Sequence, residues 1–272
     1  MQYSVLMSVY EKEQADFLEI AIESILNQTV KTNDFVIVCD GPLKEQLENV
    51  LLNYKIKYPE TFNIIKLDKN VGLGIALNEG LKYCKNDLVA RMDSDDISVY
   101  NRMELQMTCF ENDDKLAVCG GYIAEFKENP NEISSIRKVP CNHNDILTWA
   151  KKRNPMNHMT VMFRKQFVLD AGSYKKMDFA EDYYLWVRML MNNDRMLNLN
   201  NILVMARIGN GMFQRRGGRQ YVKKIYYMQN TFYKIGFINK REFCLNLFIR
   251  TINSLAPNLI RERIYKLFLR NY

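Results

Sequence analysis

The chain has 272 residues, of which 47% are hydrophobic and 25% charged, with only six prolines and twelve glycines. This composition excludes a disordered or collagen-like protein, and the length suits one large domain, or one domain with a tail, that buries its own core. No apolar run reaches the roughly 18 residues of a membrane span, and the N-terminus lacks the basic leader of a signal peptide.

The net charge of +7 is divided unevenly along the chain. From Arg207 to the end there are 14 Lys and Arg and two acids, whereas residues 1–206 hold 24 Lys and Arg and 29 acids. A basic last quarter attracts nucleic acid, anionic lipid or phosphate-bearing ligands, or it is a solvated helical face. The charge alone does not choose between these.

The cysteines and histidines give no support to a zinc site. The six cysteines form no CxxC pair, and the two histidines, His143 and His158, are far apart in the sequence. Without an export signal, we expect reduced thiols and a cytoplasmic protein.

The first half of the chain alternates apolar runs with amphipathic segments. Strands are predicted over Tyr3–Val9, Phe35–Cys39, Phe62–Leu67, Leu88–Met92 and Leu116–Cys119. Helices are predicted between them over Ala15–Leu26, Leu43–Tyr58, Gly74–Cys84 and Arg102–Glu111. This alternation predicts an α/β fold with a mostly parallel sheet covered by helices on both faces. Ligands bind such sheets beyond the carboxyl ends of the strands.

The alternation breaks past about residue 125. We predict strands over Thr160–Arg164 and Ile202–Ala206, a helix over Asp182–Met191, and helices in the remainder. The sequence shows no internal repeat and no low-complexity linker. We therefore divide it into one domain over residues 1–219 and a basic, amphipathic helical region over residues 220–272.

The sharpest local feature is an acidic strand end. Asp93, Ser94, Asp95 and Asp96 directly follow an apolar strand that carries Arg91. Carboxylates this close raise one another's pKa unless a cation neutralises them, and oxygen ligands suit Mg²⁺ or Mn²⁺. Such an ion bridges carboxylates to a diphosphate. The alternative is an acidic turn that caps the next helix.

A glycine-containing loop precedes one of the predicted helices. Gly72 and Gly74 begin a dinucleotide-type pattern, but Leu77 stands where the third glycine belongs, and the loop follows the third strand instead of the first. A dehydrogenase is therefore a weak interpretation. A glycine turn that opens a helix is compatible with anion binding at the helix start.

Three further features allow two interpretations each. Glu181 and Asp182 open an amphipathic helix, where they compensate its dipole or supply a general base. Arg215 and Arg216 lie in a glycine-rich loop that clamps phosphate or is simply exposed. His158 is a lone imidazole, which is more often a buried, hydrogen-bonded side chain than a catalytic one.

Six segments in this order resemble inverting family 2 glycosyltransferases of the GT-A fold: SVLMSVY, CDGP, KNVGLGIALNEG, ARMDSDD, NHMTVMFR and AEDYYLWVRML. The resemblance covers about residues 3–219 and is greatest to bacterial enzymes that build capsular, exopolysaccharide or O-antigen repeat units, such as the amylovoran-type transferases. The acidic segment and the AED-Y-LW segment are specific when they occur together.

The resemblance implies a role for each matched position. Asp93 and Asp95 match the DxD motif, so that Asp95 binds Mg²⁺ or Mn²⁺ and Asp93 contacts the ribose or, through water, the metal. Asp182 matches the aspartate that serves as base in the ED motif, with Glu181 beside it. The other implied positions are Val9, Tyr10, Glu11 and Asp40 for uracil and ribose, Lys69, Asn70 and Gly72 near the nucleotide, Arg91 and Ser94 in the metal loop, His158 at the acceptor site, and Arg215 and Arg216 near the diphosphate.

The resemblance also implies the reaction. The QxxRW motif and membrane spans of the processive members are absent, so we expect transfer of one hexose or N-acetylhexosamine. The expected donor is UDP-linked, although dTDP or GDP is also compatible, and the expected acceptor is a polyprenyl-diphosphate-linked saccharide. The sequence names neither the sugar, the linkage nor the oligomeric state.

The C-terminal segment and three rival functions remain open from the sequence. Asn258–Arg270 has the pattern of a helix that lies on the inner face of a membrane or packs on the body or in a dimer. The rivals are an inactive sugar-nucleotide-binding protein, a nucleic-acid-binding protein without a recognisable motif, and a nucleotidyltransferase that lacks the usual loop after the first strand.

Overall fold

Four parallel strands form the first half of the central sheet in a computed structural model that describes residues 1–209 and 217–256. In the order in which they lie side by side they are β3 (Phe62–Lys66), β2 (Asp34–Cys39), β1 (Tyr3–Val9) and β4 (Leu88–Asp93). Almost every residue of β1 and β2 is buried, which explains their continuous apolar runs. The predicted strands agree with these within a residue or two.

The second half of the sheet mixes strand directions. β8 (Met162–Arg164) runs antiparallel to both β4 and β6 (Leu116–Phe126), and β6 in turn runs parallel to β9 (Arg195–Arg207). Two short antiparallel strands, β5 (Ile97–Ser98) and β7 (Ile133–Arg137), pair with β9 and β6. The parallel arrangement predicted from the sequence thus holds for the first four strands, and the sheet as a whole is mixed.

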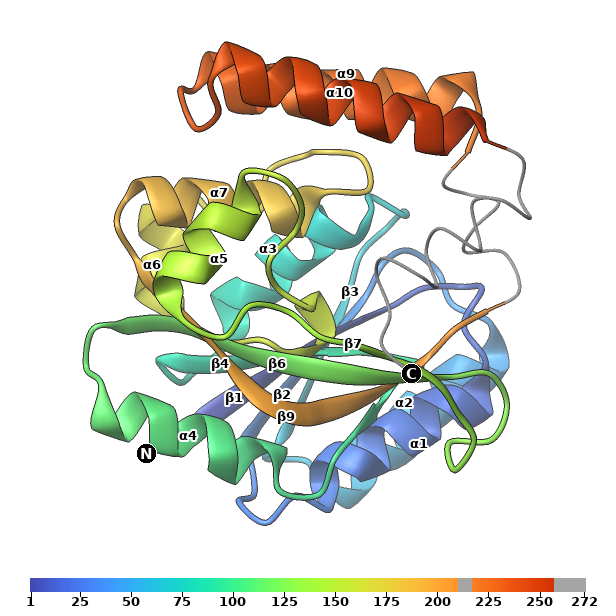
Figure 1. The fold of residues 1–272 in the computed structure, drawn as a ribbon. Helices are drawn as coiled ribbons and strands as arrows, with labels where there is room; N and C mark the ends of the chain where they lie inside the picture. The colour runs from blue at the N-terminus through green and yellow to red at the C-terminus, as the bar shows by residue number, and fades with distance from the viewer. Residues whose placement is uncertain (210–216, 257–272) are drawn as a thin grey trace.

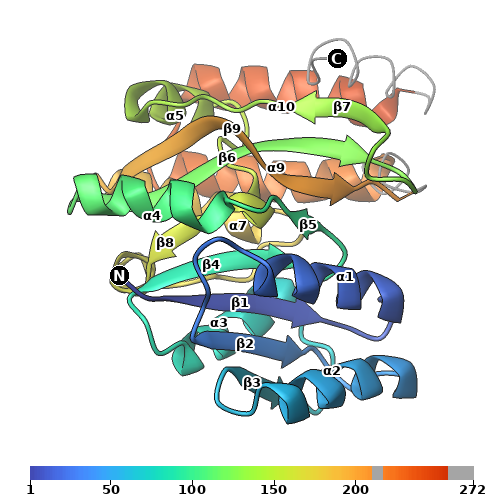
Figure 2. The same ribbon diagram turned by 90° about the horizontal axis from the view of Figure 1, so that it is seen from below.

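Helices cover both faces of this sheet, as the sequence predicted (Figures 1 and 2). One face carries α1 (Ala15–Leu26), α2 (Glu45–Lys57) and α4 (Arg102–Asn112). The other carries α3 (Leu73–Tyr83), α5 (His143–Ala150), α6 (Lys165–Asp170) and α7 (Glu181–Met191). Alternate residues of β1, such as Leu6 and Met7, enter the two separate apolar clusters beneath these layers.

Several elements differ from the sequence prediction. β6 continues past the predicted end at Cys119 through Gly120 and Gly121, and β9 begins seven residues before the predicted start. The residues predicted to open the strand at Thr160 instead form a short 3-10 turn over His158–Thr160. The helices α5 and α6 and the strands β5 and β7 are short and were not predicted.

A helical hairpin lies outside the second helical layer (Figure 1). It consists of α9 (Arg219–Lys234) and α10 (Lys240–Leu255), and the expected division of the chain at residues 219 and 220 stays a prediction. Phe232 of α9 packs edge-on against Tyr183 of α7. Asn246 of α10 donates a hydrogen bond to the Lys151 carbonyl at the end of α5. The predicted amphipathic helix over 258–270 lies outside the described residues. None of the described helices is both long and apolar enough to cross a membrane.

Candidate active site

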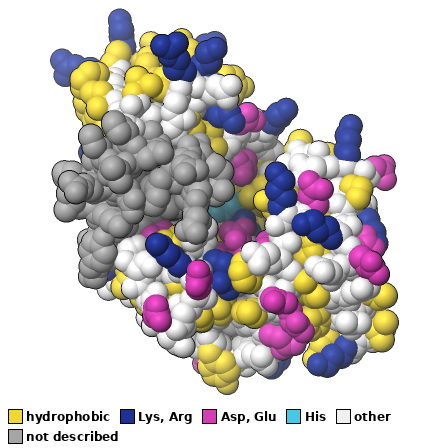
Figure 3. All heavy atoms as spheres, turned by 90° about the vertical axis from the view of Figure 1, so that its right-hand side faces the viewer, with side chains coloured by type: hydrophobic (Ala, Val, Ile, Leu, Met, Phe, Trp, Pro, Cys, Tyr) yellow, Lys and Arg dark blue, Asp and Glu magenta, His cyan; other side chains and the backbone are white. Residues whose placement is uncertain are grey.

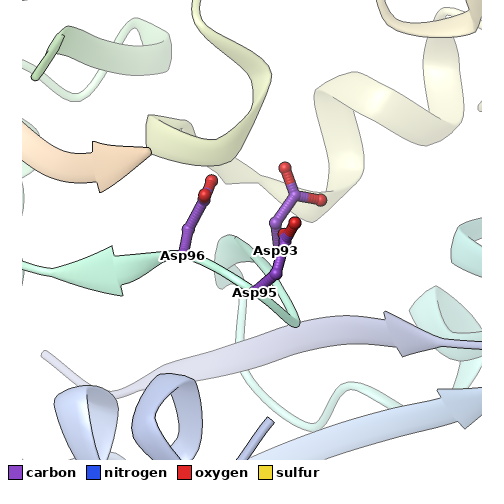
Figure 4. Close-up of side chains that lie close together, drawn as sticks. All are labelled: Asp93, Asp95 and Asp96. Atoms are coloured by element: carbon purple, nitrogen blue, oxygen red, sulfur yellow. The ribbon is translucent and has the colours of Figure 1, made fainter. Parts of the chain in front are cut away.

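Three carboxylates gather where β4 ends. Asp93, Asp95 and Asp96 each offer one oxygen atom, and these atoms lie within 4.8 Å of one another (Figure 4). The Asp93 carboxylate is paired with the guanidinium of Arg91, which is buried in the sheet. Ser94 lies between Asp93 and Asp95, and its hydroxyl donates a 2.6 Å hydrogen bond to Glu13. This bond holds the acidic loop against the segment that follows β1. Acidic side chains line a hollow in this face of the molecule (Figure 3).

The charges of this cluster are poorly compensated by the described residues. Burial and then the neighbouring Asp93 and Glu13 carboxylates raise the pKa of Asp95 to about 7. Burial and the same cluster raise the pKa of Asp96 well above its ordinary value. One Asp96 oxygen accepts a 2.8 Å hydrogen bond from the Arg207 N–H, but among the described residues no group donates to the other, which is buried. Hard oxygen ligands with excess negative charge fit Mg²⁺ or Mn²⁺.

We expect the Asp96→Asn variant to be more stable than the wild type when no divalent cation is present. The raised pKa means that the folded state loses stability as the pH rises above about 4, the ordinary aspartate value. Removing the charge should raise Tm at pH 8 by about 2–4 °C for each kcal/mol relieved, and by less at pH 5. The variant should also lose most of the Tm increase that Mn²⁺ gives the wild type. Thermal unfolding at both pH values tests this, and an equal Tm change at both would contradict it.

The charge of Arg91 acts on both the acidic loop and the start of α7. It lowers the pKa of Asp95 and Asp96 on one side and of Glu181 and Asp182 on the other. Apart from the pair with Asp93, two nitrogens of this guanidinium have no hydrogen-bond partner among the described residues. The two acidic motifs predicted from the sequence therefore share one electrostatic environment around one buried cation.

Glu181 and Asp182 occupy the first turn of α7, and the two differ in their surroundings. Asn154 donates a 2.6 Å hydrogen bond to one oxygen of Asp182. Burial raises the pKa of Asp182, but the Asn154 amide, the Tyr183 N–H and nearby arginines oppose that shift. Burial and then the neighbouring Asp182 raise the pKa of Glu181 to about 7. The hydrogen bond from the Asn154 side chain thus favours the charged form of Asp182.

The end of β2 is fastened to the loop before α3. Asp40 accepts hydrogen bonds from the backbone N–H groups of Val71, at 2.7 Å, and of Gly72, at 3.1 Å. Gly41 beside it has φ of 90°, and a Cβ there would lie 2.6 Å from the backbone nitrogen of Asn70. Only glycine meets both conditions. Gly72 forms the N-cap of α3 with φ of 90°, which supports the glycine-turn interpretation.

His158 lies in an aromatic cluster close to both motifs. Its Nε2 is 2.9 Å from the Tyr174 hydroxyl, and its ring meets the edge of Trp186 with centroids 6.0 Å apart. Burial and the Arg91 charge hold the pKa of His158 well below its ordinary value, so the ring is neutral. Asn78 of α3 fixes Tyr174 with hydrogen bonds to its backbone N–H and carbonyl.

The other predicted site residues lie around this centre. Val9 is buried and its carbonyl accepts a 2.8 Å hydrogen bond from the Asp40 N–H. Tyr10 and Glu11 are exposed beyond the end of β1, and Lys69 and Asn70 are exposed in the loop before α3. Arg215 and Arg216 lie outside the described residues.

Some residues of the site were not predicted. They are Glu13, Asn154, Tyr174 and Arg207. Asp96 was part of the predicted acidic strand end, as the third acid in four residues, but it was given no metal-binding role of its own. The others come from distant segments, and only the folded chain brings them to the site.

A family comparison decides the class of this site. Residues 4–172 match the model of "Glycosyl transferase family 2". The chain belongs to this family. The curated relatives of this glycosyltransferase include the amylovoran biosynthesis glycosyltransferase AmsE of Erwinia amylovora, which is 37% identical over 97% of this chain and 98% of its own length. They also include UDP-Gal:alpha-D-GlcNAc-diphosphoundecaprenol beta-1,3-galactosyltransferase of Escherichia coli, which is 35% identical over 100% of this chain and 98% of its own length.

Solved structures confirm the GT-A fold expected of this family 2 enzyme. S. aureus TarS 1–349 in complex with UDP-GlcNAc is similar with a TM-score of 0.65 and 16% identity, over 98% of this chain and 76% of TarS. The mannosyltransferase PcManGT of Pyrobaculum calidifontis, in complex with GDP-Man and Mn²⁺, is similar with a TM-score of 0.64 and 13% identity, over 92% of this chain and 69% of the other. The comparisons also confirm the predicted resemblance to bacterial polysaccharide-synthesis enzymes.

Proposed function

We propose that this glycosyltransferase moves one hexose or N-acetylhexosamine, with inversion, from a UDP-sugar to a hydroxyl group of a polyprenyl-diphosphate-linked saccharide. The observation that carries the proposal is the carboxylate cluster of Asp93, Asp95 and Asp96, together with a Glu181–Asp182 pair whose pKa values the same Arg91 charge lowers. The carboxylate cluster has the oxygen ligands for a metal ion bound to a diphosphate, and the Glu181–Asp182 pair has a carboxylate that can accept the proton of the acceptor hydroxyl. The E. coli relative is named for a UDP-sugar donor and a diphosphoundecaprenol acceptor, which supports this choice. The reaction would draw on cytoplasmic nucleotide-sugars.

Asp93, Asp95 and Asp96 would hold the divalent cation. When bound, Mg²⁺ or Mn²⁺ supplies Lewis-acid compensation for the charge that develops on the departing diphosphate. Arg91 holds Asp93 in place, and the hydrogen bond from Ser94 to Glu13 fixes the loop between the acids. Asp40 and the loop at residues 69–72 would form the nucleoside side of the site. Asp40 follows the carboxyl end of β2, and its hydrogen bonds with the Val71 and Gly72 N–H groups hold that loop there.

Asp182 would act as the general base. It accepts the proton of the acceptor hydroxyl as that oxygen bonds to the anomeric carbon, and the bond from this carbon to the diphosphate breaks on the opposite side. Asn154 occupies one Asp182 oxygen and so directs the carboxylate. A single displacement needs no covalent intermediate, and an α-linked donor gives a β-glycoside. Because the pKa of Asp182 is raised, the rate should fall on the acidic side at a higher pH than for an ordinary aspartate.

A transfer assay tests this function. The full chain with Mn²⁺ is incubated with UDP-galactose, UDP-glucose or UDP-N-acetylglucosamine and a synthetic alkyl-diphosphate-linked sugar. We expect UDP release that depends on the acceptor, and a β-linked product by NMR. An α-linked product would contradict the proposal. So would a rate of UDP release that is the same with and without acceptor for every donor. The family match gives no support to the inactive or nucleic-acid-binding alternatives.

A further inference from the structure

The α9–α10 hairpin carries an apolar face that no described residue covers. Along α10 the exposed side chains recur at helical spacing and form one stripe, which we call the α10 stripe: Leu245, Phe248, Ile249, Ile252 and Leu255. Phe248 is 65% exposed and Ile249 55%. Three aromatic side chains of α9 are also exposed: Tyr226, Tyr227 and Tyr233.

The opposite side of the hairpin is occupied by the body of the protein. Phe232 of α9 is fully buried against Tyr183 and Tyr184 of α7. Asn246 and Arg250 of α10 donate hydrogen bonds to carbonyls at the end of α5. The orientation of the hairpin is thus fixed, and the α10 stripe is not the side that holds it on the enzyme.

The charge of the hairpin favours an anionic partner. Residues 217–256 contain seven Lys and Arg and one acid. Lys223, Lys234, Lys240 and Arg241 are exposed on the same two helices as the apolar side chains. Figure 3 shows basic and hydrophobic side chains side by side over this part of the molecule. Docking of two copies through this face would bring like charges together, which is unfavourable. An anionic lipid surface satisfies both the apolar and the basic side chains.

We propose that the α10 stripe, with the surrounding lysines and arginines, docks this enzyme on an anionic membrane surface. The inference deepens the proposed function, since a polyprenyl-diphosphate-linked acceptor is held in a membrane. The apolar side chains enter the boundary between headgroups and acyl chains, while the exposed tyrosines and basic side chains remain at headgroup level. Hydrogen bonds from α10 to the end of α5 and ring contacts from α9 to α7 then hold the site at a fixed position relative to the lipid surface.

Vesicle co-sedimentation of the full chain tests the docking. The wild type should bind vesicles of phosphatidylethanolamine and phosphatidylglycerol, and bind vesicles of phosphatidylcholine alone far more weakly. The double variant Phe248→Ser with Ile252→Ser should bind the anionic vesicles at least about tenfold more weakly. The matched control is Leu52→Ser with Ile56→Ser, two similarly exposed apolar side chains of α2 on the other face of the sheet, which should bind like the wild type. Arg241→Glu should weaken binding by about fivefold or more.

Each outcome of this experiment is decisive. Unchanged vesicle binding by the α10 double variant would overturn the proposal. A second combination of results would also overturn it. If neither protein bound vesicles, and light scattering showed a dimeric wild type but a monomeric double variant, the face would be an interface between copies. Thermal shifts with UDP and Mn²⁺ show that the variants fold. Failure of the proposed function would appear separately, as wild-type enzyme that binds vesicles but transfers no sugar.

Discussion

The Asp182→Asn variant is expected to lose about 10³-fold in kcat while it binds UDP and Mn²⁺ like the wild type. An amide cannot accept the acceptor's proton, yet it fills the same space and can keep a hydrogen bond with Asn154. In the proposed site the donor would bind at the carboxylate cluster of Asp93, Asp95 and Asp96, so its binding should not depend on the Asp182 side chain. Initial rates of UDP release with acceptor present, together with calorimetric titration of UDP, separate the two effects.

Glu181→Gln is the matched control for this variant. Glu181 stands next to Asp182 in the same helical turn, but its pKa of about 7 leaves it partly protonated at neutral pH. We therefore expect a rate loss of about tenfold or less. A normal rate for Asp182→Asn, or a greater loss for Glu181→Gln than for Asp182→Asn, would assign the base to another residue.

The Asp95→Asn variant is expected to lose Mn²⁺-dependent binding of UDP, with affinity at least about 100-fold weaker. The amide keeps the shape of the side chain but removes a charge from a cluster in which burial, and then the neighbouring carboxylates, raise the pKa values of Asp95 and Asp96. Affinity for UDP in the absence of metal should change little. Titration calorimetry with and without Mn²⁺ measures the difference.

Asp87→Asn is the control for the loss of one acid near the same strand. Asp87 precedes β4 at its other end, and its exposed carboxylate pairs at 3.0 Å with the largely buried Arg164 side chain. An asparagine oxygen at position 87 can still accept the Arg164 hydrogen bond, so this variant should retain both folding and Mn²⁺-dependent UDP binding. If Asp95→Asn bound UDP with Mn²⁺ as tightly as Asp87→Asn does, Asp95 would not be a metal ligand.

The first half of the fold was predictable because its strands are buried on both faces. β1 and β2 consist almost entirely of buried side chains, so each reads as a continuous apolar run between helical patterns. The carboxyl ends of parallel strands necessarily share an edge of the sheet. The order of strands and acids along the chain is therefore enough to predict that Asp40 and the acidic loop lie at the same edge.

The second half was less predictable for local reasons. β6 contains Gly120 and Gly121, where a Cβ would meet Asn198 and Leu203 of the neighbouring strand. These side chains pack so closely on β6 that only glycine fits at the two positions, and the apolar run is interrupted there. β9 includes polar residues, Asn198 among them, whose amide donates to the carbonyls of Pro140 and Pro155. Neither strand therefore has the length of apolar sequence that marks β1.

The relations between the residues at the centre of the site could not be predicted without the folded structure. Both acidic motifs were recognisable from the sequence, but their common dependence on Arg91 was not. Likewise, Tyr174 lies sixteen residues from His158, and no spacing rule predicts the 2.9 Å contact between them. From the sequence, residues 258–270 were expected either to lie on a membrane or to pack on the body or in a dimer, and both remain predictions. The surface proposed here lies instead on the described α9–α10 hairpin.

Metal binding at the acidic strand end is tested most simply by anomalous scattering from a crystal soaked with UDP and Mn²⁺. We expect one manganese peak among the carboxylates of Asp93, Asp95 and Asp96, with the diphosphate of UDP bound to it and the nucleoside extending toward Asp40. A diphosphate that binds elsewhere, or manganese that is absent from these three side chains while UDP is bound, would contradict it.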